Sequence, residues 1–271
     1  MPLFLSPTFR DVLADADRAQ IGMWVCSASP LVAEICAGSG LDWLLIDGEH
    51  SPNSLESILA QLQAVAAYPI TPLVRVPSGD TVVIKQYLDL GVQNLLVPMV
   101  NTEADALAVA SAVRYPPLGV RGVGSALARA ARWNRVDNYL GRADEHVSLF
   151  VQIETADAVA NAAAIASVDG VDGAFVGPSD LAASMGYLGQ QEHPKVVEAV
   201  ERAIRTISAL GKPVGVNAFG PKVAERYRAA GATFVLVGAD VALLARGSEA
   251  LAASFIPSPE QAESSPPRAS Y

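Results

Sequence analysis

The feature that most constrains the fold is a series of eight short apolar segments, most of them separated by stretches with helical periodicity. Most of these segments are continuously hydrophobic and rich in β-branched residues, which is typical of parallel strands buried on both faces. The predicted strands are Ile21–Cys26, Trp43–Asp47, Pro72–Val76, Asn94–Met99, Ser148–Glu154, Gly173–Val176, Pro213–Asn217 and Thr233–Val237. The predicted helices are Ser54–Ala67, Asp80–Leu90, Glu103–Val113, Ala156–Ser167, Pro194–Leu210 and Pro221–Ala230.

Eight units of a strand followed by a helix favour a closed (β/α)8 TIM barrel, a fold of the α/β class, over an open doubly wound sheet. The chain has 271 residues, and one such barrel takes about 250 residues. An open sheet would be expected to carry a glycine-rich dinucleotide turn after its first strand. The segment Ser27–Pro30 has no such turn. We therefore predict a single barrel domain over residues 1–256.

Two segments do not fit the repeating pattern. Residues 115–142 form a long insertion between the fourth and fifth predicted strands, and a long loop at this position is usually functional. The insertion contains a basic and aromatic cluster, namely Arg129, Arg132, Trp133 and Arg135. Residues 257–271 are rich in proline and serine, and we expect this tail to be disordered.

The composition excludes several classes of protein. It is 51% hydrophobic and 17% charged, so a large buried core is available. The net charge is −9 and the basic residues form no tract, which argues against nucleic acid and anionic membranes as partners. Cys26 and Cys36 have no metal-ligand spacing and resemble reduced core residues. Without a signal peptide or an apolar run of membrane-spanning length, we expect a soluble cytoplasmic protein.

Carboxylates follow two consecutive predicted strands, at the end of the barrel where catalytic residues of this fold lie. Gln152 and Glu154 are two residues apart on one strand and therefore face the same side. Asp180 follows the next strand, and two carboxylates completed by waters and a substrate oxygen suit Mg²⁺ or Mn²⁺. The pattern predicts that Glu154 and Asp180 bind a divalent metal. In the alternative interpretation, Glu154 pairs with Arg75, and Asp180 caps a helix that starts at Leu181.

Two further strand ends carry candidate catalytic groups. His50 closes an apolar strand beside two acids, which is the place for a proton shuttle. A structural hydrogen bond is the alternative. Arg75 ends its strand, and a guanidinium at the barrel mouth can stabilise an enolate or carboxylate oxygen. For Arg75 the alternative is a structural salt bridge to Glu49 or Glu154.

Asp89 and the Gly177–Asp180 turn are candidates on other grounds. Asp89 ends a helix, where the macrodipole disfavours an anion, so we expect a cationic or imidazole partner unless it is only a surface acid. The turn offers backbone N–H groups at a helix N-terminus, which can bind a substrate carboxylate.

The positions of the lysines argue against one mechanism. A Schiff-base aldolase needs a lysine inside the barrel. None of the four lysines ends a predicted strand, and Lys212 precedes the seventh strand, at the wrong face. A metal is then needed to polarise a substrate carbonyl.

Several long motifs resemble those of a known family. They are WLLIDGEHSPN, VRVP, YLDLGVQNLLVPMV, RYPPLGVRGVGSALARAARWNR, VQIET, GAFVGPSDLAASMG and GATFVLVGAD. From about Gly22 to Asp240, the sequence is similar to the HpcH/HpaI aldolases, the 4-hydroxy-2-oxoheptane-1,7-dioate aldolase family. These are class II pyruvate aldolases, built on the (β/α)8 TIM barrel of the phosphoenolpyruvate/pyruvate superfamily. The resemblance implies a divalent cation (Mg²⁺, Mn²⁺ or Co²⁺) and a homo-hexamer built as a trimer of dimers.

The resemblance also implies roles for individual residues. The metal ligands would be Glu154 and Asp180, and pyruvate would chelate the metal. Arg75 would stabilise the enolate. His50 would move the proton on the aldol hydroxyl together with Asp89 of a neighbouring subunit. The other implied roles are orientation of the donor by Gln152, carboxylate binding at the amides of Ser179 and Asp180, support from Asp47 and Glu49, and lining of the pocket by Trp24.

One position departs from the family pattern. The seventh strand carries polar Asn217, where we expect an apolar side chain in close relatives, and Asn217 would lie near the aldehyde. The function hypothesis is reversible retro-aldol cleavage of a 4-hydroxy-2-oxo acid to pyruvate, or an analogue such as hydroxypyruvate, and an aldehyde. One alternative is a CoA-thioester lyase of the citramalyl/malyl-CoA type, in which the cluster Arg129–Arg135 would bind phosphates. The other is a non-catalytic, oligomeric metabolite-binding barrel.

Overall fold

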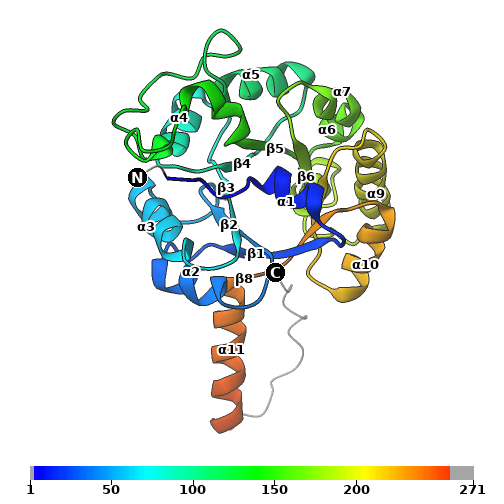
Figure 1. Ribbon diagram of the computed structural model, residues 1–271. Helices are drawn as coiled ribbons and strands as arrows, with labels where there is room; N and C mark the ends of the chain where they lie inside the picture. The colour runs from blue at the N-terminus through cyan, green and yellow to red at the C-terminus, as the bar shows by residue number, and fades with distance from the viewer. Residues whose placement is uncertain (1–2, 257–271) are drawn as a thin grey trace.

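The computed structural model describes residues 3–256, and its centre is a closed barrel of eight parallel strands paired in chain order (Figure 1). The strands are β1 (Gln20–Val25), β2 (Trp43–Asp47), β3 (Thr71–Arg75), β4 (Asn94–Val97), β5 (Ser148–Ile153), β6 (Gly173–Val176), β7 (Val214–Asn217) and β8 (Phe234–Ala239). Pairing of β1 with β8 closes the barrel, with a register shift between Gly22 and Trp24. The predicted (β/α)8 fold is confirmed.

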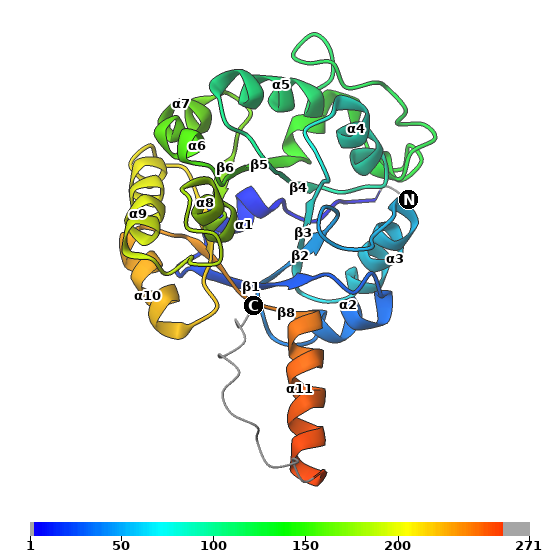
Figure 2. The ribbon, with the colours of Figure 1, turned by 180° about the vertical axis from the view of Figure 1, so that it is seen from behind.

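Helices surround the barrel, as Figures 1 and 2 show from opposite sides. They are α1 (Phe9–Asp15), α2 (Pro30–Ala37), α3 (Leu55–Val65), α4 (Thr81–Asp89), α5 (Glu103–Val113), α6 (Ala156–Ala160), α7 (Ala162–Ser167), α8 (Pro178–Ser184), α9 (Pro194–Ser208), α10 (Pro221–Ala230) and α11 (Asp240–Phe255). Two 3₁₀ helices, η1 (Arg129–Ala131) and η2 (Leu140–Glu145), lie in the 115–142 insertion or at its end.

One predicted helix is divided in two. The sequence predicts a continuous helix over Ala156–Ser167, but this stretch breaks at Asn161 into α6 and α7. Asn161 has φ −94° and ψ 4°, and its side-chain amide donates to the carbonyl of Asn101 at 2.8 Å. This tertiary hydrogen bond stabilises a local conformation that a straight helix would not allow.

Aromatic side chains fill the N-terminal end of the barrel. Phe9, at the start of α1, is fully buried and packs among the side chains of the strands. Its ring centroid lies 5.4 Å from that of Trp43, 5.5 Å from Phe150 and 5.2 Å from Phe234. Such tilted and edge-on contacts add to the hydrophobic stabilisation of each ring. Helix α1 therefore closes this end of the barrel.

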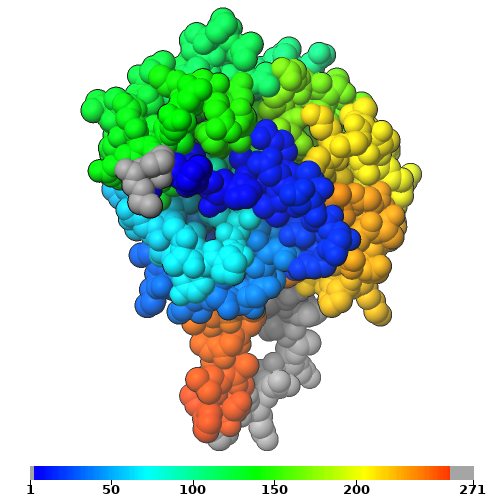
Figure 3. All heavy atoms as spheres, viewed as in Figure 1, coloured from blue at the N-terminus to red at the C-terminus, as the bar shows by residue number. Residues whose placement is uncertain are grey.

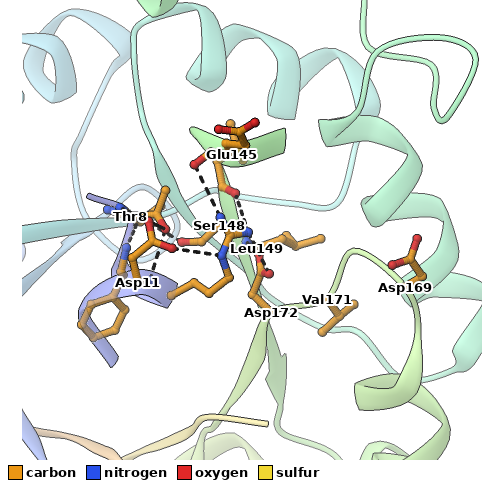
Figure 4. Close-up of polar contacts among 12 residues, drawn as sticks. Thr8, Asp11, Glu145, Ser148, Leu149, Asp169, Val171 and Asp172 are labelled. Atoms are coloured by element: carbon orange, nitrogen blue, oxygen red, sulfur yellow. Dashed lines mark hydrogen bonds and ion pairs between the residues drawn. The ribbon is translucent and has the colours of Figure 1, made fainter. Parts of the chain in front are cut away.

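Polar contacts fix α1 in this position (Figure 4). Thr8 and Asp11 form a capping box at the start of the helix. Arg10 forms an ion pair with Asp172 at 3.1 Å, and the other oxygen of Asp172 accepts from the amide of Leu149. In the space-filling view of Figure 3, the N-terminal segment lies across the centre of this face. A substrate must therefore enter from the opposite, C-terminal face.

Two parts of the chain extend beyond the barrel wall. The 115–142 insertion has a small apolar core, to which Ala143, the next residue along the chain, also contributes. The core residues are Ala130, Ala131, Val136, Tyr139 and Ala143. Helix α11 projects away from the barrel (Figures 1 and 3).

No helix within residues 3–256 is long and apolar enough to cross a membrane. The predicted disorder of residues 257–271 concerns a segment outside the described residues.

Candidate active site

The strands end on the face turned toward the viewer in Figure 2, and polar residues are found at or shortly after these ends. Five strands carry a candidate residue at their last position or next to it. These residues are Trp24 on β1, Asp47 on β2, Arg75 on β3, Gln152 on β5 and Asn217 on β7. Glu49, Glu154 and Asp180 follow shortly after β2, β5 and β6. The barrel thus brings side chains from most of the chain to one mouth, which is where enzymes of this fold bind substrates.

Arg75 is held rigidly by two carboxylates. Its Nε and Nη2 donate to the two oxygens of Asp47 at 2.8 and 2.9 Å, a bidentate pair, and its Nη1 lies 2.9 Å from Glu49 Oε2. Both Arg75 and Asp47 are buried, so the pairing offsets the cost of removing each charge from water. The salt bridge to Glu49 that the sequence left open is present. No ion pair joins Arg75 to Glu154 within the part of the chain that the structure describes.

Trp24 connects Arg75 to Asn217. The guanidinium carbon of Arg75 lies 4.3 Å from the centroid of the Trp24 ring, within the range of a cation–π contact. The indole N–H of Trp24 donates to Oδ1 of Asn217 at 3.1 Å. Since this bond uses the amide oxygen, the Asn217 NH₂ group is directed elsewhere, and Asn217 is only half-buried. It can therefore donate a hydrogen bond to a ligand.

Glu154 is a buried carboxylate without an ion-pair partner in the described chain. One oxygen accepts from the backbone amide of Met99 at 2.7 Å, and the other accepts from the side-chain amide of Gln152. Burial, with the negative charges of Asp180 and Glu49 added, raises the pKa of Glu154 to about 7. Burial also raises the pKa of Glu49. Burial is the main cause of both shifts, and the carboxylates of the site outnumber its single buried guanidinium.

A small cation fits this excess of negative charge. A Cβ atom on Gly177 would lie 3.2 Å from Glu154 Oε2 and 3.0 Å from Gln152 Nε2, so any side chain at this position would crowd both groups. The buried Oε1 of Gln152 has no hydrogen-bond partner in the described chain. Within residues 3–256 no group of three or more His, Cys, Asp or Glu side chains is placed to hold a metal. Two carboxylates, Glu154 and Asp180, suit a hard divalent cation only if water and substrate oxygens complete its coordination.

Asp180 and Ser179 lie in the first turn of α8. The N-cap of this helix is Gly177 and the helix begins at Pro178, so the alternative in which Asp180 caps a helix starting at Leu181 is wrong. Asp180 is exposed on the open face of the site. The hydroxyl of Ser179 lies 2.8 Å from Gln191 Oε1, and first-turn amides have no partner inside their own helix.

His50 and Asp89 are not in contact within one chain. His50 is exposed, and its imidazole Nε2 lies 3.8 Å from Glu49 Oε2. Asp89 lies at the end of α4, where Arg121 of the insertion approaches its Oδ1 at 3.6 Å. That oxygen is buried and has no hydrogen-bond partner in the described chain. The pairing of His50 with a neighbouring subunit's Asp89 stays a prediction.

Two contributors to the site were not predicted from the sequence. Met99 adopts a left-handed conformation with φ 57° and directs its N–H at Glu154. Gly177 contributes by having no side chain, because a methyl group at this position would crowd Gln152 and Glu154. Asp240, which the sequence places at the end of the eighth strand, is buried and accepts from the amides of Cys26 and Ser27 at 2.8 and 3.0 Å. It thereby connects the end of β1 to α11. A conformation of φ above zero in a non-glycine residue is a signal that only the structure gives.

A (β/α)8 barrel with buried carboxylates and a fixed guanidinium at its C-terminal face has the arrangement of an enzyme. The family described as HpcH/HpaI aldolase/citrate lyase matches residues 20–247, and the chain belongs to it. A hydroxypyruvate/pyruvate aldolase of Deinococcus radiodurans is 56% identical over 97% of this chain and 95% of its own. A 4-hydroxy-2-oxo-heptane-1,7-dioate aldolase of Salmonella heidelberg is 53% identical over 91% of this chain and 94% of its own.

Solved structures give the same result. An HpcH/HpaI aldolase/citrate lyase family protein from Burkholderia cenocepacia matches with a TM-score of 0.87 and 37% identity, over 92% of this chain and 99% of that chain. The predicted family is therefore confirmed. The prediction of an aldolase, a carbon–carbon lyase, is confirmed with it.

Proposed function

We propose that the chain cleaves a 4-hydroxy-2-oxo acid reversibly to pyruvate, or hydroxypyruvate, and an aldehyde, with a divalent cation as cofactor. The observation that carries this proposal is the buried Glu154 carboxylate, which lies near two other acids and has no ion-pair partner among residues 3–256. The names of the relatives from Deinococcus and Salmonella fit the same reaction class.

Glu154 and Asp180 would hold the cation, and the chemistry of these ligands suits Mg²⁺, Mn²⁺ and Co²⁺. When bound, such a cation polarises the 2-oxo group of the substrate. Gln152 donates to Glu154 and keeps a free acceptor oxygen in the described chain, which is suited to orienting the donor. The amides of Ser179 and Asp180 would bind the substrate carboxylate.

Arg75 would stabilise the enolate that forms when the C3–C4 bond of the substrate breaks. Asp47 and Glu49 hold its guanidinium, and the Trp24 ring covers one face of it. The charge is thus oriented before the reaction, which makes it effective in stabilising a transition state. Asp47 and Glu49 act through Arg75 and would not touch the substrate.

His50 would accept the proton of the C4 hydroxyl, and a proton transferred to C3 of the enolate would complete pyruvate. In the synthetic direction both transfers are reversed. Its exposed position at the mouth leaves it open to a second subunit. Asp89 of that subunit would orient the imidazole in a cytoplasmic homo-hexamer. Asp89 is only half-buried, with its side chain 32% exposed, which leaves it accessible to a partner from outside its own chain.

Asn217 would select polar substrates. Its oxygen is used by Trp24, so it presents an NH₂ group beside the donor and aldehyde positions. A hydroxyl on either reactant could accept this hydrogen bond, which favours hydroxypyruvate as a donor or a hydroxyaldehyde as an acceptor.

The two alternatives are weaker. Two arginines of the cluster proposed for CoA phosphates, Arg129 and Arg132, line a cavity with the starts of β3 and β4, at the N-terminal end of the barrel. Glu154 lies at the other end. A non-catalytic barrel would not explain a guanidinium and carboxylates arranged for enolate chemistry.

The test measures pyruvate release from hydroxy-oxo acids by chelated protein, before and after addition of Mg²⁺ or Mn²⁺. We expect activity only with metal. Glu154→Ala should abolish metal binding, whereas Glu198→Ala, which removes an exposed acid of α9, should leave it unchanged. Activity that survives complete chelation would exclude the metal-dependent mechanism.

A further inference from the structure

Arg129 and Arg132 are two half-buried arginines that form no ion pair within residues 3–256. Every other buried or half-buried arginine of the described chain has a carboxylate within 4.0 Å; these are Arg10, Arg75, Arg114 and Arg121. Two like charges that are partly removed from water destabilise each other unless an anion compensates them. The pair therefore requires an explanation that the aldolase site does not supply.

The two guanidinium groups converge at one place. Each Nη1 lies 2.8 Å from the point that a Cβ atom on Gly91 would occupy. Arg129 Nη1 donates to the carbonyl of Leu90 at 2.9 Å, and Arg132 Nη1 donates to the carbonyl of Arg129 at 2.6 Å. These bonds fix the side chains and leave Nε and Nη2 of both groups without a partner in the described chain. These four nitrogens are not among the buried unpaired polar atoms of the described chain, so they are accessible to solvent.

The pair lines a cavity at the N-terminal face of the barrel. The cavity has a volume of about 120 Å³, and its apolar wall comes from α3 and the residues before β3, including Leu62, Val65 and Ile70. No Asp or Glu side chain is among the described residues that line it. A water molecule needs roughly 10–15 Å³ on such a measure, so an ion with its waters fits. A coenzyme does not fit, because sites for larger ligands have roughly 300–1,000 Å³.

The backbone that places Arg132 is strained. Arg132, Trp133 and Asn134 have φ values of 48°, 54° and 61°, three consecutive non-glycine residues in the left-handed region. This conformation is unfavourable for non-glycine residues, and such strain is concentrated at functional sites. Burial, together with the positive charge of Arg132, also lowers the pKa of Arg129 to about 10. The segment thus carries both a conformational and an electrostatic cost in bringing the two arginines together.

We propose that Arg129 and Arg132 form a binding site for a small oxyanion at the N-terminal face, separate from the aldolase site. The forked donors of a guanidinium match the oxygens of phosphate and of carboxylate. The anion would clamp the 115–142 insertion onto the turn at Gly91, which lies two residues after Asp89. Its source would be free inorganic phosphate or a small carboxylic acid.

The experiment titrates chelated, full-length protein with inorganic phosphate and with acetate by calorimetry, at constant ionic strength in chloride. We expect one anion bound per chain and a higher melting temperature in its presence. Preference for phosphate or for acetate identifies the source. Arg129→Gln and Arg132→Gln should each weaken binding at least tenfold, whereas Arg135→Gln removes a nearby exposed charge and should not change it.

Two further measurements separate a lost site from a misfolded chain. Arg129→Lys keeps the charge but loses the fork, so it should fold and still bind the anion several-fold more weakly. A crystal soaked in selenate should show an anomalous peak between the two guanidinium groups. The proposal is overturned if wild type does not bind, if the three Gln variants bind equally, or if selenate occupies only the barrel mouth. Lack of binding would mean that a carboxylate of another subunit already compensates the pair.

Discussion

Glu154 is a buried carboxylate that must lose its proton before it can bind a cation. Burial and the charges of Asp180 and Glu49 raise its pKa to about 7, and the same two charges would favour a cation in the proposed site. Proton and metal therefore compete for the same oxygens.

We expect the affinity for Mn²⁺ to fall as the pH is lowered from about 8 to 6. Below the pKa of Glu154 the loss should approach about tenfold per pH unit. Glu49→Gln removes one of the charges that raise this pKa and should move the profile to lower pH. Calorimetric titration of chelated protein at several pH values measures this, and an affinity that does not depend on pH would contradict it.

The raised pKa of Glu154 also affects the stability of the metal-free chain, and there the dependence on pH has the opposite sign. Its folded state holds the Glu154 proton more tightly than the unfolded state does, since the ordinary pKa is 4.5 and the folded value is about 7. The contribution of Glu154 to the free energy of unfolding should therefore decrease as the pH rises between these values. Added metal should reverse this trend, which melting curves with and without Mg²⁺ can show.

Gly177 offers a steric test of the cation site. Its φ is −99°, so alanine has no backbone penalty there, but the new methyl group would lie 3.2 Å from Glu154 Oε2. We expect Gly177→Ala to weaken metal binding by about tenfold, in line with overpacking costs on the order of 1 kcal/mol. Gly238→Ala places a methyl group in open space on β8 and is the matched control. Equal metal affinity of the two variants would argue against a cation beside Gly177.

At the scale of elements, the sequence predicted the strands well, because a short, continuously apolar run bounded by polar residues forms a buried strand more readily than a helix. The predicted ends of the strands differ from the observed ends by a few residues, because the register with the neighbouring strand decides where hydrogen-bonded pairing stops. The division at Asn161 could not be predicted, because it depends on a hydrogen bond to Asn101, sixty residues away. Helices α1 and α2 are too short for a clear periodic pattern.

The site residues were predictable where a polar side chain follows an apolar strand, as for Arg75 and Glu154. The contributions of Met99 and Gly177 were not, because a backbone N–H and a missing side chain leave no mark in composition or spacing. The contact between Asp89 and Arg121 joins α4 to the insertion, and only the folded chain shows it.

Helix α11 is an apolar helix that is largely exposed to solvent in the single chain. It projects from the barrel with Leu243, Leu244, Leu251 and Phe255 exposed. Apolar side chains gathered in this way on one helix are expected to be covered by another copy of the chain in the proposed hexamer.

We therefore expect the double variant Leu244→Ser/Leu251→Ser to sediment as a smaller assembly than wild type and to have less activity. Burial of apolar side chains is the main source of stability of such an interface, and the two serines would weaken it. Glu249→Ser changes an exposed polar residue of the same helix and should sediment as wild type. An unchanged mass of the double variant, measured by analytical ultracentrifugation, would exclude α11 from the interface.

At the scale of the whole molecule, the main question is whether one active site takes residues from two chains. His50 and Glu154 would act in the site of one barrel, and Asp89 would come from the next. Mixed assemblies of inactive variants can distinguish this arrangement from a site built within one chain.

Chains carrying His50→Ala and chains carrying Asp89→Ala should each have little activity. After unfolding and joint refolding, hybrid assemblies should regain activity, because some sites then combine an intact His50 with an intact Asp89. A mixture of His50→Ala and Glu154→Ala chains should regain none, since both positions belong to the same barrel. Recovery in the second mixture, or its absence in the first, would contradict the shared site.

The aromatic cluster around Phe9 has a consequence for how this protein can change. Much of the aromatic packing inside the barrel is concentrated at the end opposite the carboxylates, so loops at the mouth can be exchanged without disturbing the layer that holds the strands together. Laboratory evolution of new aldehyde preferences should therefore be limited by the geometry of the mouth and far less by failure to fold.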